Sequence, residues 1–535
     1  MRHLSVLFPL SLSLAMLSAA TLAQAAPALP QQGGEDGVAM AADMAAGRTS
    51  SERLTRAALD RIAALDRKGP TLRAVIAVNP DALAQARAAD LRRKQGHMLG
   101  PLDGLPVLVK DNIETKDPMA TTAGSLALVA NVTGRDAPVV ARLRAGGAVI
   151  LGKTNLSEWA NIRSTASVSG WSAVGGQAKN PYALDRTPCG SSSGSGVGVA
   201  AGYVPLALGT ETDGSVVCPS SINGLVGLKP TLGLISRTHV VPISHSQDTP
   251  GPMARSVRDV AMMLGVIAGS DPADPATAQA DARRVDYAAS LAGASLKGVR
   301  LAVLRPKMIA PLAARYEAAL AVLAAQGAVL VPVEQPKLEG LDEAEHVVLM
   351  TELKGDLNAY LATTPAAVRT RSLNDLVAFN KANAAQEMPY FAQESFIEAQ
   401  AAKGEDDAEY LGMLAKSRRL AGAEGIDAML KTAQASMLIE PTYGPGWLID
   451  PVYGDGFEGP SASQLPAVSG YPDLTVPMGL VRGLPVGLSF IARPYQDAML
   501  LGAGYVYEQA SHARVEPRFL PQADVGPGQE GMAAK

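Results

Sequence analysis

The sequence predicts an α/β sandwich, in which helices pack around a central β-sheet. Segments with apolar residues at helical spacing alternate with short apolar runs of the length of buried strands. The 535 residues are 47% hydrophobic and 18% charged, a composition typical of a soluble globular protein. The chain contains no internal repeat and no low-complexity tract, so we expect one large domain in spite of its length.

The first half of the chain gives the clearest alternation. Apolar residues recur at helical spacing over residues 51–65, and an alanine-rich segment at 81–93 predicts a second helix. The apolar run 105–109 predicts a strand that is buried on both faces. Residues 139–145 then predict a helix, and residues 148–151 predict the next buried strand.

The second half continues this pattern with more helix. Strands are expected at 299–304 and 329–333. Residues 340–435 lack strand signals and are expected to be mostly helical, with charges spread around the helices. Short strands are expected again over 466–492, and a closing helix over 498–510.

A loop rich in Gly, Pro and Tyr is expected at residues 436–465. A long loop inside a compact protein is often a binding element. Tyr443 and Trp447 in this loop are therefore candidate substrate-binding residues.

The N-terminus has the pattern of an export signal. Arg2 and His3 precede an apolar run at 4–20, and residues 23–25 (AQA) offer a small-residue cleavage site. The run is shorter than the roughly 20 residues that a membrane span needs. We expect a signal peptide at 1–25, cleavage near Ala26, and a mature protein that is periplasmic or secreted and not bound to a membrane.

The remaining boundaries follow from composition. Residues 26–50 are rich in Pro, Gly and Ala and are expected to form a leader arm. The main domain is expected at 51–515, and a flexible tail at 516–535. The net charge is −4, with acidic and basic residues interspersed, so the sequence lacks the basic footprint of a nucleic-acid-binding protein.

The two cysteines, Cys189 and Cys218, exclude a disulfide scaffold and a CxxC metal or redox pair. They leave two alternatives open. An oxidising compartment would allow one disulfide between them, and otherwise they are two small buried residues.

The segment from Pro188 to Pro230 is the densest in chemically active side chains. It contains two Gly/Ser-rich stretches, 189–196 (CGSSSGSG) and 209–215 (GTETDGS), separated by apolar residues. The apolar residues exclude a flexible linker, so the glycines are expected to let backbone and hydroxyl groups approach a ligand. Ser192 in the first stretch is a further candidate substrate-binding residue.

Two familiar motifs in this half of the chain are misleading. Residues 190–194 fit the G-x-S-x-G nucleophile elbow of an esterase, with Ser192 as nucleophile, but the elbow needs a preceding strand and residues 180–188 predict a loop. Residues 147–154 match the G-x-x-x-x-G-K-T phosphate loop. The N–H groups of 148–151 are expected to be used in a sheet, so they cannot cradle a phosphate.

Lys110, at the end of the strand 105–109, is a candidate base. Desolvation in an apolar setting can lower the pKa of a lysine enough for the amine to accept a proton. A serine hydrolase without a well-placed histidine needs such a base. Activity would then rise with pH through the lowered pKa. The rival base is His245, which lies in 242–248 (PISHSQD) near Asp248.

Taken together, these segments resemble the amidase signature family. Residues 104–112 (GLPVLVKDN) are similar to its catalytic-lysine segment, 190–194 (GSSSG) to its Gly-Ser-Ser-Gly stretch, and 209–215 to the segment that ends in its nucleophile. Further agreement lies at 150–156 (ILGKTNL), 224–231 (GLVGLKPT) and 477–479 (PMG). The resemblance covers roughly residues 40–510 and implies an α/β/α sandwich with a central mixed twisted β-sheet and peripheral helices.

The resemblance also implies the catalytic roles. Ser215 would be the nucleophile that becomes acylated, Ser191 a bridging serine after a cis peptide bond, and Lys110 the neutral base. The N–H groups of Thr212, Asp213, Gly214 and Ser215 would form the oxyanion hole. Neither a metal nor a cofactor is implied.

The stretch around Ser215 departs from the commonest pattern of the family. Asp213-Gly214-Ser215-Val216-Val217 stands where Gly-Gly-Ser-Ile-Arg is usual, and Cys189 replaces a glycine. This variant resembles the bacterial peptide amidase branch, which releases ammonia from the C-terminal carboxamide of peptides. It argues against the transamidating enzyme that charges transfer RNA with glutamine. The alternatives are an amidase of small aliphatic or aryl amides, an inactive amide-binding protein, and an α/β-hydrolase esterase that uses Ser192.

Overall fold

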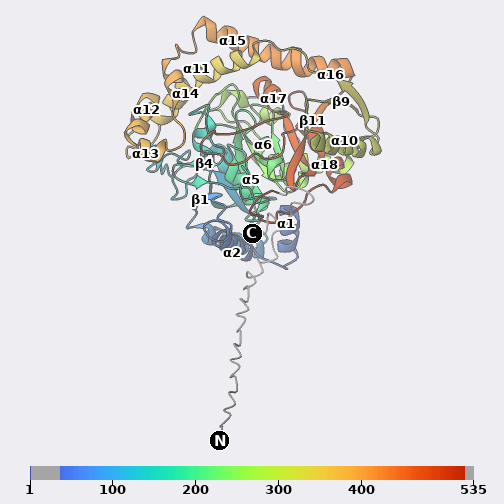
Figure 1. Cartoon of the computed structure of the whole chain (residues 1–535). Helices are drawn as coiled ribbons and strands as arrows, with labels where there is room; N and C mark the ends of the chain where they lie inside the picture. The colour runs from blue at the N-terminus through green and yellow to red at the C-terminus, as the bar shows by residue number, and fades with distance from the viewer. Residues whose placement is uncertain (2–35, 524–535) are drawn as a thin grey trace. The chain divides into compact units, whose positions relative to one another are not determined.

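One mixed β-sheet runs through the part of the chain that the computed structural model describes, Met1 and residues 36–523 (Figure 1). Residues 2–35 and 524–535 lie outside this part, and with them the predicted signal peptide beyond Met1, residues 26–35 of the leader arm and the end of the tail. Eleven of the described strands form the sheet. In sheet order they are β1 (Val75–Val78), β3 (Val149–Thr154), β2 (Pro106–Lys110), β6 (Leu206–Glu211), β8 (Thr249–Ala254), β7 (Val226–Lys229), β12 (Asp473–Val481), β13 (Leu484–Ile491), β11 (Met437–Pro441), β9 (Arg300–Leu304) and β10 (Val329–Val333).

The sheet is mixed, as predicted. β2 lies parallel to both β3 and β6, and β9 lies parallel to both β10 and β11. The remaining neighbours, such as β6 and β8, are antiparallel. Apolar residues of β2, β3 and β6 are fully buried, which explains why these strands appear in the sequence as continuous apolar runs.

Helices pack around this sheet. The α-helices of six residues or more in the described part are α1 (Gly37–Ala45), α2 (Ser51–Leu65), α3 (Ala82–Lys94), α4 (Pro138–Ala145), α5 (Ser193–Ala200), α6 (Val217–Ile222), α7 (Val257–Ile267), α10 (Ala310–Ala325), α11 (Leu341–Ala362), α12 (Leu373–Ala382), α14 (Glu394–Ala401), α15 (Ala408–Arg418), α16 (Asp427–Ala433), α17 (Gln464–Ser469) and α18 (Asp497–Ser511). Figure 1 shows α11 and α15 running side by side, and the two helices are in contact. Among the described residues, no helix combines the length and the apolar character that a bilayer crossing requires.

Helix α2 illustrates how the sequence forms these elements. The Ser50 side chain accepts a hydrogen bond from the N–H of Arg53 and so caps the first turn. Ala58, Ile62 and Leu65 then fall on one buried face of the helix. The helix begins and ends at the residues that the apolar spacing predicts.

The structure differs from the sequence prediction in three segments. Residues 466–469, predicted to begin a run of strands, belong to α17, and β12 and β13 follow it. Residues 437–441, inside the predicted loop, form strand β11, because pairing with β9 and β13 outweighs the local Gly and Pro content. Within the segment expected to be a leader arm, α1 has its N-terminal N–H groups bound by the carboxylate of Asp259 on α7, and buries Met40 and Met44.

The parallel strands position the candidate catalytic residues. Carboxyl ends of neighbouring parallel strands meet at one edge of a sheet, where α/β proteins commonly bind ligands. Lys110 is the last residue of β2, and Glu211 is the last residue of β6. Residues 212–215 leave the sheet directly after Glu211, so this edge brings Lys110 and the segment of Ser215 together.

Candidate active site

Lys110 and Ser191 are in direct contact below the protein surface. The Lys110 Nζ atom lies 2.7 Å from Ser191 Oγ, and both side chains are fully buried. Burial lowers the pKa of Lys110 to about 7, because a charged amine is costly away from water, although the carboxylates of Asp248 and Glu211 oppose this shift. Near neutral pH a large share of Lys110 is therefore an uncharged amine that can accept a proton.

Thr210 orients this amine. Nζ of Lys110 donates to the Thr210 carbonyl oxygen at 3.2 Å and lies 2.8 Å from Thr210 Oγ1. The Nδ2 group of Asn112 also donates to Oγ1, at 2.9 Å. A neutral lysine has two N–H bonds and one lone pair. When both N–H bonds point to the oxygens of Thr210, the lone pair is left facing Ser191.

Ser191 is held by its backbone just before α5. The Gly190–Ser191 peptide bond is cis, as the resemblance implied. The carbonyl oxygen of Ser191 accepts from the N–H of Ser157 at 3.1 Å. The next residue, Ser192, donates its N–H to the carbonyl oxygen of Ser215 at 3.2 Å, which ties the two serine segments together.

Ser215 is presented by a turn between β6 and α6. Gly214 has φ = 76°, a left-handed conformation that glycine adopts without penalty. A Cβ atom at this position would also collide with the Tyr443 hydroxyl. Beyond the turn, the Glu211 carboxylate accepts from the N–H groups of Val216 and Val217 at 2.7 and 2.9 Å and so fixes the start of α6.

A pocket of about 260 Å³ opens over this turn. Its lining includes Thr212, Asp213, Gly214 and Ser215, and Ser215 is 7% exposed. None of these four N–H groups donates a hydrogen bond to another residue in the described part of the chain. The turn thus presents a hydroxyl together with unused backbone donors, which is the arrangement that stabilises an oxyanion.

One part of the pocket wall is aromatic. Tyr443 and Trp447, the two loop residues singled out from the sequence, both line it, and Phe457 packs against both rings at centroid distances of 5.3 and 5.6 Å. Asp455 anchors this loop, because its carboxylate accepts from Trp447 Nε1 at 2.9 Å and from Ser169 Oγ at 2.6 Å.

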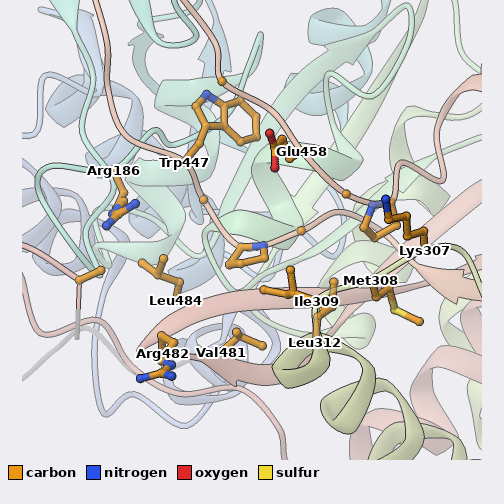
Figure 2. A pocket seen from close by; sticks show the side chains of 17 residues that line it. Arg186, Lys307, Met308, Ile309, Leu312, Trp447, Glu458, Val481, Arg482 and Leu484 are labelled. Atoms are coloured by element: carbon orange, nitrogen blue, oxygen red, sulfur yellow. The ribbon is translucent and has the colours of Figure 1, made fainter. Parts of the chain in front are cut away.

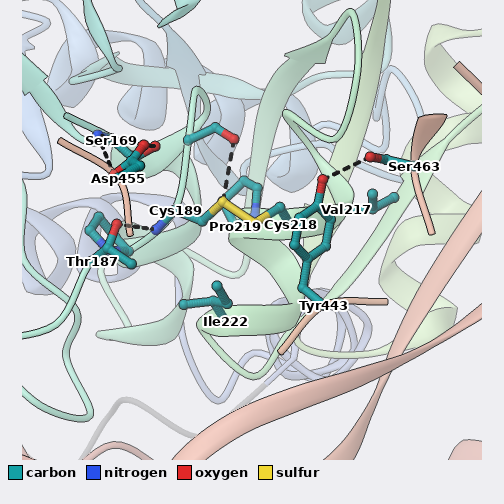
Figure 3. The surroundings of a disulfide bond; sticks show 12 residues. Ser169, Thr187, Cys189, Val217, Cys218, Pro219, Ile222, Tyr443, Asp455 and Ser463 are labelled. Atoms are coloured by element: carbon teal, nitrogen blue, oxygen red, sulfur yellow. Dashed lines mark hydrogen bonds between the residues drawn. A yellow bond between two sulfur atoms is a disulfide. The ribbon is translucent and has the colours of Figure 1, made fainter. Parts of the chain in front are cut away.

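Cys189 and Cys218 form a disulfide bond, which decides between the two alternatives that the sequence left open (Figure 3). Both cysteines line the pocket. Cys189 precedes Ser191 by two residues, and Cys218 follows Ser215 by three. The bond therefore links the two catalytic-serine candidates through a short covalent path.

The structure places the remaining candidates elsewhere. Ser192 is fully buried, and its hydroxyl donates to the Thr210 carbonyl oxygen at 3.0 Å and accepts from the Thr210 N–H at 3.2 Å. This pairing keeps Ser192 away from a substrate, both as a contact and as an elbow nucleophile. His245 binds Asp356 through Nδ1 at 3.0 Å, which raises the pKa of His245 to about 9. His245 is thus charged at neutral pH and is a poor base.

Sequence reasoning missed Thr210, Asn112 and Glu211. Two signals could have found them. Asn112 lies two residues beyond Lys110 on the same segment, and Thr210 and Glu211 end the strand that leads to Ser215. Polar side chains are unusual at the ends of buried strands unless they have a functional or structural role.

The geometry at the edge of the sheet, a buried lysine with a lowered pKa in contact with a serine hydroxyl, is the arrangement that a serine hydrolase with a lysine base needs. Comparison with known proteins gives the family. The Amidase family matches residues 53–501 of the chain, which therefore belongs to the amidase signature family. The protein is an amidohydrolase that acts on linear amides. The predictions of family and of fold are both confirmed.

Known relatives extend over most of the chain. The X-ray structure of a native peptide amidase from Stenotrophomonas maltophilia is 49% identical, with a TM-score of 0.87, and the match covers 91% of this chain and 99% of that one. A protein of Arabidopsis thaliana described as a probable amidase is 39% identical over 88% of this chain and 89% of its own length. A glutamyl-tRNA(Gln) amidotransferase component from Chloroflexus aurantiacus is 36% identical, over 90% of this chain and 97% of its own length.

Proposed function

We propose that the protein hydrolyses the C-terminal carboxamide of peptides and releases ammonia. The observations that carry this proposal are the buried amine of Lys110, whose pKa is lowered to about 7 and which lies beside Ser191, and the pocket that Ser215 lines. The similarity to a peptide amidase, which is higher than that to the tRNA-dependent amidotransferase, supports a peptide amide as the substrate.

Catalysis begins with attack of Ser215 Oγ on the carbonyl carbon of the amide. The proton of Ser215 passes to Ser191 Oγ while the proton of Ser191 passes to Lys110 Nζ. Only protons move in this relay, so the charged side chain of Lys110 stays in its buried position. The N–H groups of residues 212–215 bind the oxyanion that forms. One such donor contributes about 3–4 kcal/mol to stabilising the transition state.

Return of the proton along the same path lets ammonia leave. The C–N bond breaks, the leaving nitrogen takes the proton from Ser191, and Lys110 returns a proton to Ser191. The acyl group remains on Ser215. A water molecule then repeats the sequence in place of the serine hydroxyl, and releases a peptide with a free carboxylate. Each step balances without a metal, an oxidant or a reductant.

Ammonia release from a panel of amides tests the substrate class. The panel contains N-acetylated amino-acid amides, peptide amides, acetamide, benzamide and free glutamine. We expect kcat/KM for the peptide amides to exceed that for the simple amides by at least tenfold. Preference for acetamide or benzamide would assign the protein to the small-amide alternative, and preference for glutamine would assign it to the amidotransferase-like activity. An absence of ammonia with every amide would favour an inactive binding protein.

We also propose that the protein is exported. The basic residues, apolar run and small-residue site within residues 1–25 support this proposal. The mature protein from its native host is expected to begin near Ala26 and to occur in the periplasm or the medium. N-terminal sequencing after cell fractionation measures this, and a cytosolic protein that still begins with Met1 would contradict it.

A further inference from the structure

A second and larger cavity shares a wall with the pocket of Ser215. It measures about 1020 Å³, compared with about 260 Å³ for the pocket (Figure 2). Trp447 lines both. In the loop that follows, Phe457 lines the pocket, while Gly456 and Glu458 on either side of it line the large cavity. The segment from Trp447 to Glu458 therefore borders both spaces.

The lining of the large cavity is apolar at one side. Met308, Ile309 and Leu312, at the start of α10, contribute side chains, as do Val481 and Leu484 from the ends of β12 and β13 (Figure 2). Ile309 is 56% exposed, so its side chain is open to a ligand in this cavity.

The charged groups of the large cavity are mainly cationic. Arg186, Lys307 and Arg482 line it, together with the carboxylate of Glu458. Arg186 also forms an ion pair with Asp185 at 3.5 Å. Lys307 and Arg482 are exposed, and they lie on either side of the apolar residues that line this cavity (Figure 2). Cations around an apolar floor favour a ligand that is apolar and negatively charged.

We propose that this large cavity binds the part of a peptide substrate that precedes its amidated residue, and that it favours acidic side chains there. This inference rests on the proposed function. The pocket over Ser215, at about 260 Å³, lies below the range of roughly 300–1,000 Å³ that is usual for ligand sites, so it has room for little more than the terminal residue. A longer peptide needs a second space, and Trp447 borders both.

The test compares peptide amides that differ only upstream of the amidated residue. Two N-acetylated tetrapeptide amides carry either two Glu or two Lys residues before the same apolar terminal residue, and the N-acetylated terminal residue amide is the short reference. Ammonia release gives kcat/KM for wild type, Lys307→Glu and, as a matched control, Lys381→Glu, an exposed lysine on α12.

We expect wild type to favour the acidic over the basic tetrapeptide by about two- to fivefold for each exposed charge pair, and less at high salt. Lys307→Glu should abolish or invert this ratio and leave cleavage of the short amide unaffected. The control Lys381→Glu should keep the wild-type ratio. The inference is overturned if the short amide is cleaved as well as both tetrapeptides, or if the ratio survives in Lys307→Glu. Failure to cleave even the short amide would instead overturn the proposed function.

Discussion

The Nζ atom of Lys110 lies 2.7 Å from the Oγ atom of Ser191, and neither side chain reaches solvent. Burial lowers the pKa of this lysine to about 7, from an ordinary value of about 10.5, so a large share of it is an uncharged amine near neutral pH. In the proposed mechanism, Ser191 relays a proton to this buried amine from Ser215, which is 7% exposed and lines the pocket.

The first prediction is a pH dependence set by Lys110. Only the neutral amine accepts a proton, so kcat/KM should rise with pH, reach half of its maximum near pH 7, and level off above. A histidine base would give a similar curve. The assignment therefore depends on variants measured across pH.

Lys110→Ala should reduce kcat by at least a thousandfold, whereas His245→Ala should keep most of the activity and the same midpoint. His239→Ala serves as a second control, since its ring is also outside the contacts of Lys110. Loss of activity in His245→Ala, with Lys110→Ala still active, would show that the base is wrongly assigned.

A second prediction concerns stability. Because the folded pKa of Lys110 lies below its unfolded value, the unfolded chain binds the extra proton between about pH 7 and 10.5. This group therefore makes folding less favourable at pH 7 than at pH 10, by about 3–4 kcal/mol. Lys110→Met should raise the denaturant midpoint at pH 7 and flatten its increase towards pH 10. A lower midpoint in Lys110→Met than in wild type at pH 7 would contradict this.

A third prediction identifies Thr210 as a positioning residue for Lys110. Thr210→Val keeps the carbonyl acceptor but removes Oγ1, which leaves the amide of Asn112 and one N–H of Lys110 without a partner. We expect kcat to fall about 10- to 100-fold, since a buried unpaired polar group costs about 1–3 kcal/mol. KM should change little, and the pH midpoint should move. Thr210→Ser should restore kcat, and an unchanged midpoint in Thr210→Val would refute the role.

Most secondary structure near the site could be predicted from the sequence, because buried strands such as β2 and β3 are visible there as apolar runs. The phosphate-loop motif at 147–154 is excluded on the same ground, since β3 occupies Val149–Thr154. Strand β11 could not be predicted, because its pairing with β9 and β13 is formed by residues more than 40 positions away.

The residues of the candidate site are predicted mainly from the family resemblance and less from the residue pattern itself. A serine-rich stretch does not indicate which hydroxyl faces a pocket, and the sequence could not show that Ser192 is bound to the backbone of Thr210. The orientation of the Lys110 amine likewise depends on Thr210 and Asn112, which approach it only in the fold. The sequence allowed either a disulfide or two separate buried cysteines, and only the positions of the two segments in the fold decide between them.

A fourth prediction concerns the disulfide between Cys189 and Cys218. The two cysteines are 29 residues apart, and closing a loop of this length stabilises the fold by about 3–4 kcal/mol on the chain-entropy model. The variant Cys189→Ser/Cys218→Ser should unfold at a lower denaturant midpoint, and its kcat should fall because the bond joins the segments of Ser191 and Ser215. A reductant should reproduce both effects only after partial unfolding, since both cysteines are buried. Equal midpoints of wild type and variant would contradict the prediction.

The most direct test of the whole account is to find the atom that becomes acylated. An activated fluorophosphonate reacts with the nucleophile of a serine hydrolase, and peptide mapping by mass spectrometry locates the adduct. The account predicts one adduct, on Ser215, that is lost in Ser215→Ala and retained in Ser192→Ala, while Lys110→Ala labels far more slowly. An adduct on Ser192 in the wild-type protein would contradict the assignment of the nucleophile and of the base behind it.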